Sequence, residues 1–146
     1  MPFSGAHCSM KHEASREGDR WLAQAERDLR DAQFLLSGGK YNMACFLAQQ
    51  AAEKALAGYL YWKGAEDVWG NSIGDLCEDA ALFDQTFHVL KVDTVYLDKY
   101  FYITRYPRYL PSGIPSEAFD EEEARRATFL AEGVIRFVKE RAEGHS

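Results

Sequence analysis

The sequence predicts an all-α protein, an up-and-down helical bundle of four long helices plus one short helix. Apolar residues recur with the helical period in residues 21–36, 41–63 and 92–102, and again from residue 120 onward. No stretch alternates between apolar and polar residues in the way that a half-buried β-strand does. Loops rich in glycine or proline separate the helical segments, as in a bundle with short connections.

The first two long helices differ in how their apolar residues are distributed. In residues 21–36 the apolar positions fall within one arc about 100° wide, and the two glycines at 38 and 39 end that helix. Residues 41–63 are apolar on several sides. A helix of this kind is either central in its bundle or shared with a second subunit, so the sequence predicts a homodimer.

The remaining helices have recognisable ends. The short helix lies in residues 71–81, where Ser72 precedes Asp75 by three positions as in a capping box. The helix over residues 92–102 must end before Pro107, which lacks a backbone N–H and disfavours helix geometry at the preceding residue. Asp120 is the expected N-cap of the last helix.

The chain has 146 residues, of which 47% are apolar, and this fits a single domain. We expect a flexible N-terminal tail over residues 1–18, a bundle domain over residues 19–142 and a C-terminal tail over residues 143–146. The net charge of −6 argues against non-specific affinity for duplex DNA or anionic membranes. Neither a membrane-spanning run nor a secretory signal is present, so we expect a cytoplasmic protein without membrane contact.

The three cysteines are odd in number and form no Cys-x-x-Cys pair, which argues against a disulfide framework or a zinc site. Cys45 and Cys77 occupy apolar helical positions and are expected to be buried thiols in a reducing cytosol. His7, Cys8 and His12 could bind a metal, but a mobile tail holds ligands poorly. We therefore expect neither a metal nor a cofactor.

Residues 100–113, YFYITRYPRYLPSG, contain four tyrosines, two arginines and two prolines. Guanidinium groups bind phosphate in a bidentate fashion, and tyrosine rings can stack on nucleobases. Such a stretch is suited to a nucleotide, a short single-stranded RNA or a partner protein. The candidate binding residues are Tyr100, Tyr102, Arg105, Tyr106, Pro107 and Arg108.

A structural role for the same residues is the alternative. Arg105 could form a buried ion pair with Glu53, which lies at the edge of the apolar face of the second long helix. Tyrosines at a helix end often cap a core, with the hydroxyl group reaching water. Four further polar residues are candidate supporting residues: Gln50, Glu53, Lys54 and Asn71.

Two strings in the chain resemble the HEPN family over about residues 20–140: AERDLRDAQFLLSGGKYNMACFLAQQAAEKALAGYL and LDKYFYITRYPRYLPSGIPSEAFDEEEA. The second contains a Tyr-x4-Arg-Tyr-Pro element, formed here by Tyr100, Arg105, Tyr106 and Pro107. The resemblance implies a bundle related to the helical substrate-binding part of some nucleotidyltransferases. It also implies homodimerisation and a minimal nucleotidyltransferase as partner, in a two-component or toxin–antitoxin pair.

One departure from the family pattern bears on catalysis. Many HEPN proteins are metal-independent ribonucleases with an Arg-x4-6-His motif, but no histidine follows Arg105 within that distance. Asn71 stands where similar proteins often have a histidine. We therefore expect a binding or partner-docking module without catalytic residues. The alternatives are a ribonuclease in which a tyrosine or glutamate moves the proton, and a structural homodimer with a degenerate site.

Overall fold

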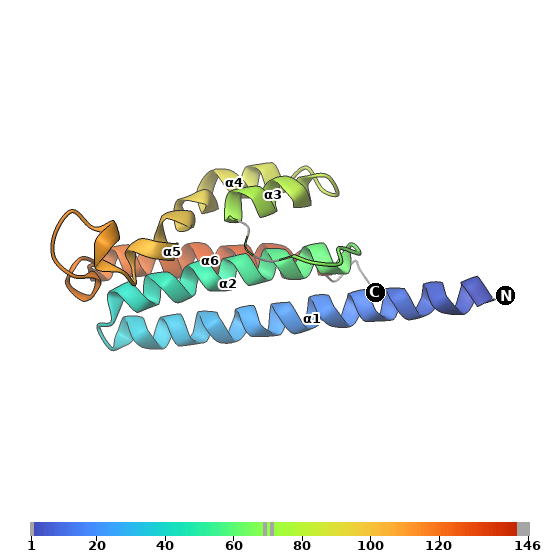
Figure 1. Cartoon of the computed structure of the whole chain (residues 1–146), viewed down its shortest axis with the longest axis horizontal. Helices are drawn as coiled ribbons and strands as arrows, with labels where there is room; N and C mark the ends of the chain where they lie inside the picture. Colours follow the sequence, from blue (N-terminus) through green and yellow to red (C-terminus); the bar gives the residue numbers. More distant parts are fainter. Residues whose placement is uncertain (1, 69, 71, 143–146) are drawn as a thin grey trace.

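The computed structural model describes residues 2–68, 70 and 72–142, with side chains from residue 11 onward. Three long helices, α1 (Pro2–Ser37), α2 (Tyr41–Trp62) and α6 (Glu121–Ala142), run side by side along the molecule (Figure 1). The shorter helices α3 (Ile73–Ala81) and α4 (Phe87–Thr94) pack against each other above α2 and α6. The described residues contain no strand, so the predicted all-α bundle is confirmed.

The predicted fourth long helix is broken in the structure. α4 passes into the 3-10 helix η1 (Val95–Lys99) and then into the single turn α5 (Tyr100–Ile103). The break follows Thr94, whose hydroxyl donates to the carbonyl of Leu90 at 2.8 Å. Threonine back-bonding of this kind bends helices, and the nearby β-branched residues Val92 and Val95 are poor helix formers.

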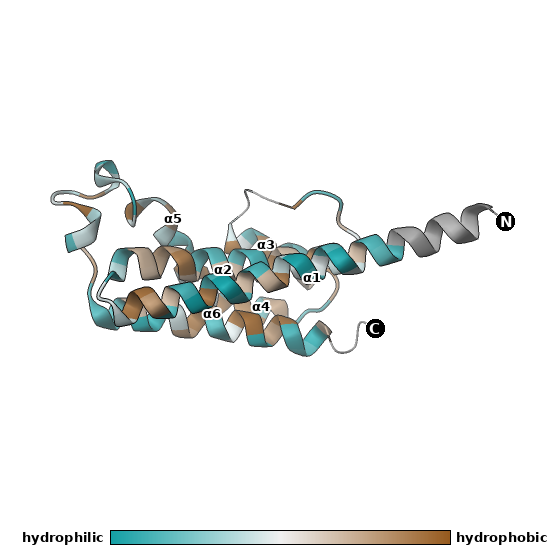
Figure 2. Ribbon diagram, turned by 90° about the horizontal axis from the view of Figure 1, so that it is seen from below, coloured by the Kyte–Doolittle hydropathy of each residue, from teal (hydrophilic) through white to brown (hydrophobic). Residues whose placement is uncertain are grey.

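The N-terminal segment also differs from the prediction. The sequence predicts a tail without regular structure over residues 1–18, whereas α1 begins at Pro2. Residues 11–17, KHEASRE, lack the apolar periodicity used to find helices, but they include several residues with high intrinsic helix propensity. This propensity lets α1 continue past the end of α2, as the projecting helix in Figure 2 shows.

α2 is the central helix, because it packs against α1, α6, α3 and α5. Its C-terminal residues Tyr61 and Trp62 are buried, and the ring of Phe46 lies 6.2 Å from that of Phe101. The chain itself therefore covers the apolar sides of α2 that predicted a second subunit. The homodimer stays a prediction, and support for it has to come from another surface.

The predicted helix starts are confirmed by hydrogen bonds. Ser72 accepts the N–H of Asp75 at 3.1 Å, and Asp120 accepts the N–H of Glu123 at 2.8 Å. Asp98 is a second cap of α3. Its carboxylate accepts the N–H groups of the first two residues of α3, at 2.7 and 3.1 Å, a contact that the sequence does not reveal. This cap fixes η1 against the start of α3.

The two central cysteines are buried, as predicted. Burial raises the pKa of the Cys45 thiol to about 12 and that of the Cys77 thiol to about 11. Both groups are therefore protonated at neutral pH and act as small apolar side chains.

Candidate functional site: a tyrosine–arginine patch

The stretch rich in tyrosine and arginine lies at the end of the bundle where α1 turns into α2 (Figure 1). α5 is tied to the start of α2, because Asn42 donates to the carbonyl of Thr104 at 3.0 Å. After α5 the chain extends at Tyr106 and enters the short 3-10 helix η2 (Pro107–Tyr109). This geometry turns several side chains outward. We call the set Tyr102, Arg105, Tyr106, Arg108 and Tyr109 the tyrosine–arginine patch.

The three tyrosines of the patch expose about half of their surface. Tyr102, Tyr106 and Tyr109 are 51%, 46% and 47% exposed. The rings of Tyr102 and Tyr109 lie 5.0 Å apart with an interplanar angle of 31°, and Tyr106 meets Tyr109 nearly edge-on at 6.3 Å. The patch thus presents a group of aromatic surfaces to solvent, held by contacts among the rings themselves.

Arg105 is half-buried within the patch. Its Nε and one terminal nitrogen donate to the carbonyl of Phe101, at 2.9 and 2.6 Å. Its guanidinium carbon lies 4.3 Å from the ring centroid of Phe46 and 5.0 Å from that of Tyr106. Arg105 therefore has a structural role, in closing the C-terminal turn of α5.

The ion pair between Glu53 and Arg105 is not formed in the described structure. Arg105 packs beside Phe46, and Glu53 lies two helical turns further along α2. Arg105 instead pairs with no carboxylate in the part of the chain that the structure describes. Its charge is balanced only by a carbonyl oxygen and ring faces.

Arg108 is exposed on the first turn of η2, and its guanidinium carbon lies 5.7 Å from the ring centroid of Tyr109. No carboxylate among the described residues pairs with it. The patch therefore holds two unneutralised guanidinium groups on a chain whose net charge is −6. Exposed Pro107 lies between them and restricts the backbone.

Tyr100, which the sequence placed with the binding residues, lies in the core instead. It is fully buried, and its hydroxyl donates to Glu123 at 2.8 Å and contacts the hydroxyl of Tyr96 at 3.2 Å. Burial raises the pKa of Tyr100 far above its ordinary value. Tyr100 thus links α5 to α6 and presents no ring to a ligand.

The candidate supporting residues lie away from the patch. Lys54 donates to buried Asp28 of α1 at 2.5 Å, and Gln50 donates to Gln49 at 2.7 Å and to Glu53 at 3.3 Å. Burial raises the pKa of Glu53, against the opposing effect of the neighbouring Lys54 charge. Lys54 thus ties α2 to α1, whereas the contacts of Gln50 and Glu53 lie within α2. Asn71 lies outside the described residues.

A second cationic cluster was missed by the sequence analysis. Lys99 Nζ lies 3.8 Å and the Arg126 guanidinium carbon 4.2 Å from the ring centroid of Tyr96. Hydrogen bonds with Lys99 and Tyr100 lower the pKa of Tyr96. Arg126 belongs to α6, some thirty positions from Tyr96, so no local spacing in the sequence indicates this contact.

The geometry can be set beside known proteins. The sequence model of the HEPN domain matches residues 19–141. The chain belongs to the HEPN family. A protein from Thermus thermophilus, known from its crystal structure, is 40% identical with a TM-score of 0.80, over 85% of this chain and 97% of that one. No curated protein is similar enough to count as a match.

Two further crystal structures carry the family name. An archaeal HEPN homologue is 35% identical with a TM-score of 0.71, and the match covers 86% of this chain and 97% of that one. A HEPN domain protein from Thermotoga maritima is 33% identical with a TM-score of 0.68, over 85% and 98% of the two chains. The HEPN match begins at residue 19, so the first half of α1 precedes it.

Proposed function

We propose that this HEPN protein is a binding module without catalytic residues, which takes a nucleotide or single-stranded RNA on the tyrosine–arginine patch and works with a minimal nucleotidyltransferase. The observation that carries the proposal is the pairing of half-exposed tyrosine rings with two guanidinium groups that no described carboxylate neutralises. Stacking on a ring contributes about 1–3 kcal/mol per base in single-strand binding.

The two arginines have different parts in this proposal. Arg108 is exposed and free to turn toward a phosphate oxygen. Arg105 keeps its position through the Phe101 carbonyl and presents its remaining N–H groups at the edge of the patch. A ligand would thus meet one pre-positioned and one adjustable cation. The acidic remainder of the chain disfavours non-specific binding of long polyanions, which makes the patch a local site.

The proposal of a module without catalysis rests on the poor acid–base properties of the described side chains in the patch. The described histidine side chains, His12 and His88, belong to α1 and α4 and take no part in the patch. Tyrosine has an ordinary pKa near 10 and is a poor general base at neutral pH. If the purified protein cleaves single-stranded RNA with and without divalent metal, and Arg105→Lys abolishes cleavage, the ribonuclease alternative replaces this proposal.

A partner surface is needed for a docking role. Leu82, Phe83, Val89 and Val92, between the end of α3 and the outer side of α4, are 55–85% exposed. No helix in the described part of the chain is both long and apolar enough to cross a membrane. These exposed apolar side chains support a contact with a protein, either the nucleotidyltransferase or a second copy. Light scattering of the protein and its Val92→Asp variant tests the homodimer, which predicts that the variant shifts the dimer toward monomer.

Fluorescence anisotropy with a fluorescein-labelled oligouridylate tests ligand binding directly. Arg108→Ala is expected to weaken binding by about tenfold or more, since tenfold corresponds to the lower end of the range for one hydrogen bond to a charged group, while helical circular dichroism stays unchanged. The matched control is Arg125→Ala, because Arg125 is an exposed arginine that Glu121 already neutralises at 2.5 Å. Equal affinities for both variants would contradict the proposal.

A further inference from the structure

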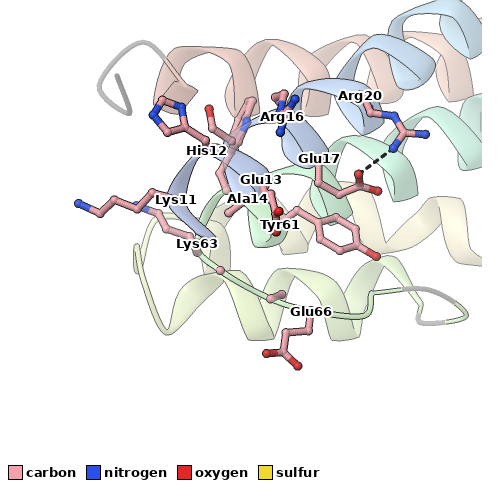
Figure 3. A pocket seen from close by; sticks show the side chains of 14 residues that line it. Lys11, His12, Glu13, Ala14, Arg16, Glu17, Arg20, Tyr61, Lys63 and Glu66 are labelled. Atoms are coloured by element: carbon pink, nitrogen blue, oxygen red, sulfur yellow. Dashed lines mark hydrogen bonds and ion pairs between the residues drawn. The ribbon is translucent and has the colours of Figure 1, made fainter. Parts of the chain in front are cut away.

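A groove lies at the opposite end of the bundle from the patch, where α1 continues past the end of α2. It has a volume of about 1180 Å³. One wall is α1 around Lys11 to Arg20, and the other is the C-terminus of α2 with the following loop to Glu66 (Figure 3). Part of this α1 wall precedes residue 19, where the HEPN match begins. The groove therefore lies partly outside the matched domain.

The base of the α1 wall is fixed by a close helix crossing. Gly18 is buried directly against the indole of Trp62, and Trp62 donates from Nε1 to Asp19 at 2.9 Å. A Cβ on Gly58 would lie 2.9 Å from the backbone oxygen of Gly18, so both glycines are needed for this approach. The direction in which α1 leaves the bundle, and with it the groove, is set by this contact.

The groove gathers cations that lack acidic partners. Lys11, Arg16 and Lys63 line it, and no carboxylate in the described structure pairs with any of them. Lys11 belongs to α1 and Lys63 is the C-cap of α2, and both extend on the same side of the groove in Figure 3. On a chain with a net charge of −6, such a set is an attractive site for anionic groups.

The acidic residues of the groove reduce this charge only in part. Glu17 accepts from Arg20 at 2.9 Å and from Trp21 at 3.0 Å, so its carboxylate is already engaged. Glu66 points away from α1 in Figure 3. Glu13 remains as a carboxylate beside the three cations. The groove therefore favours a ligand of moderate negative charge whose own apolar or basic groups can lie near Glu13.

The residues that line the groove distinguish between two kinds of anionic ligand, nucleotides and acidic peptides. The groove's aromatic residues, Tyr61 and Trp62, are only 7% and 6% exposed, so they offer no ring face on which a nucleobase could stack. Three small residues, Ala14, Gly64 and Ala65, also line the groove. Such a surface suits a peptide chain with a small or medium apolar side chain, flanked by acidic residues that meet the lysines.

We propose that the groove between α1 and the end of α2 docks an acidic peptide segment of a partner protein, with carboxylates on Lys11 and Lys63 and one apolar side chain against Ala14 and Ala65. This site is independent of the tyrosine–arginine patch, so it can stand if nucleotide or RNA binding at the patch fails.

The probe for this site is a short fluorescein-labelled peptide of glutamates around one central leucine. Anisotropy is expected to show binding that weakens as salt rises, because the contacts are surface ion pairs. Lys11→Ala and Lys63→Ala are each expected to weaken binding by up to about fivefold, and the double variant by more. Arg136→Ala is the control, because Arg136 is an exposed arginine on α6 that pairs with Glu132 at 3.3 Å.

Several results would each overturn the proposal. They are a failure of the peptide to bind, equal binding by the double lysine variant, and displacement of the peptide by an oligouridylate as effectively as by unlabelled peptide. A peptide in which lysines replace the glutamates must also fail to bind. Light scattering at the same protein concentrations detects a second copy in the groove, and a dimer that the double lysine variant dissociates would likewise overturn a separate peptide partner.

Discussion

The two ends of the bundle both collect aromatic and basic residues, but they arrange them in opposite ways. At the patch the tyrosine rings are about half exposed and the arginines lie on or beside them. At the groove Tyr61 and Trp62 are buried, and Lys63 Nζ lies beside another ring, 5.5 Å from the centroid of Tyr59. Between Phe46 and Trp62, α2 separates the two ends by about 24 Å. Composition alone therefore does not define a binding site, because the exposure of the rings decides what can bind.

The largest expected effect comes from the helix crossing that shapes the groove. Gly18→Val places a branched side chain against the buried indole of Trp62, and overpacking of this kind costs about 1–3 kcal/mol of folding stability. Denaturant unfolding is expected to show this loss, together with loss of the acidic-peptide binding, while oligouridylate binding in the folded protein persists. Gly133→Ala is the control, because an added Cβ there meets open space.

If Gly18→Val left peptide binding intact in a folded protein, the groove would not depend on the position of α1. Simultaneous loss of oligouridylate binding would show that the two ends are not independent.

At the patch, a change of similar size is expected in the affinity for the oligouridylate, with little change in folding stability. Tyr102→Ala removes a ring that is 51% exposed, so oligouridylate binding should weaken by about 1–3 kcal/mol while the melting temperature changes little. Tyr102→Phe keeps the ring and should bind like the parent protein. Isothermal titration calorimetry measures both variants, and equal loss in the phenylalanine variant would indicate that the hydroxyl, and not stacking, is recognised.

The smallest expected effect lies between the two ends, at Glu53. Burial raises the pKa of this carboxyl in the folded protein, so its stabilising contribution is present below the unfolded pKa and is lost as pH rises through the folded pKa. Glu53→Gln removes that titration. The variant should therefore melt at a higher temperature than the parent at neutral pH, and the difference should shrink at acidic pH.

Thermal melts at several pH values measure this difference. A Glu53→Gln variant that is less stable than the parent at neutral pH would show that the carboxylate makes a favourable contact in its charged form. Binding of the oligouridylate and of the acidic peptide is not expected to change, because Glu53 belongs to neither the tyrosine–arginine patch nor the groove.

The sequence predicted the helices better than it predicted the site. Helical periodicity located α2, α6 and the C-terminal half of α1, because burial of one face imposes that period on any packed helix. The tyrosine-rich composition of residues 100–113 put Tyr100 and Tyr102 together in one predicted site. Residues two positions apart in a helix point about 200° away from each other, and only Tyr102 faces solvent. The pairing of Glu53 with Arg105 was also wrong, since it depended on how far along α2 the last loop packs.

The groove had no sequence signal at all. It arises because Gly18 fits against Trp62, two residues that are far apart in the chain, and because helix propensity alone carries α1 beyond the bundle. Contacts of this kind are decided by tertiary packing, which neither composition nor periodicity records.

The most direct test of the account is one pair of NMR titrations on the same labelled protein. With an oligouridylate, the account predicts amide shift changes confined to residues 101–110, with none near residues 11–16 or 63–66. With the acidic peptide it predicts the reverse. Oligouridylate shifts centred on the groove, or no shifts at the patch up to millimolar ligand, would contradict the claim that exposed rings beside unpaired arginines define the nucleotide site.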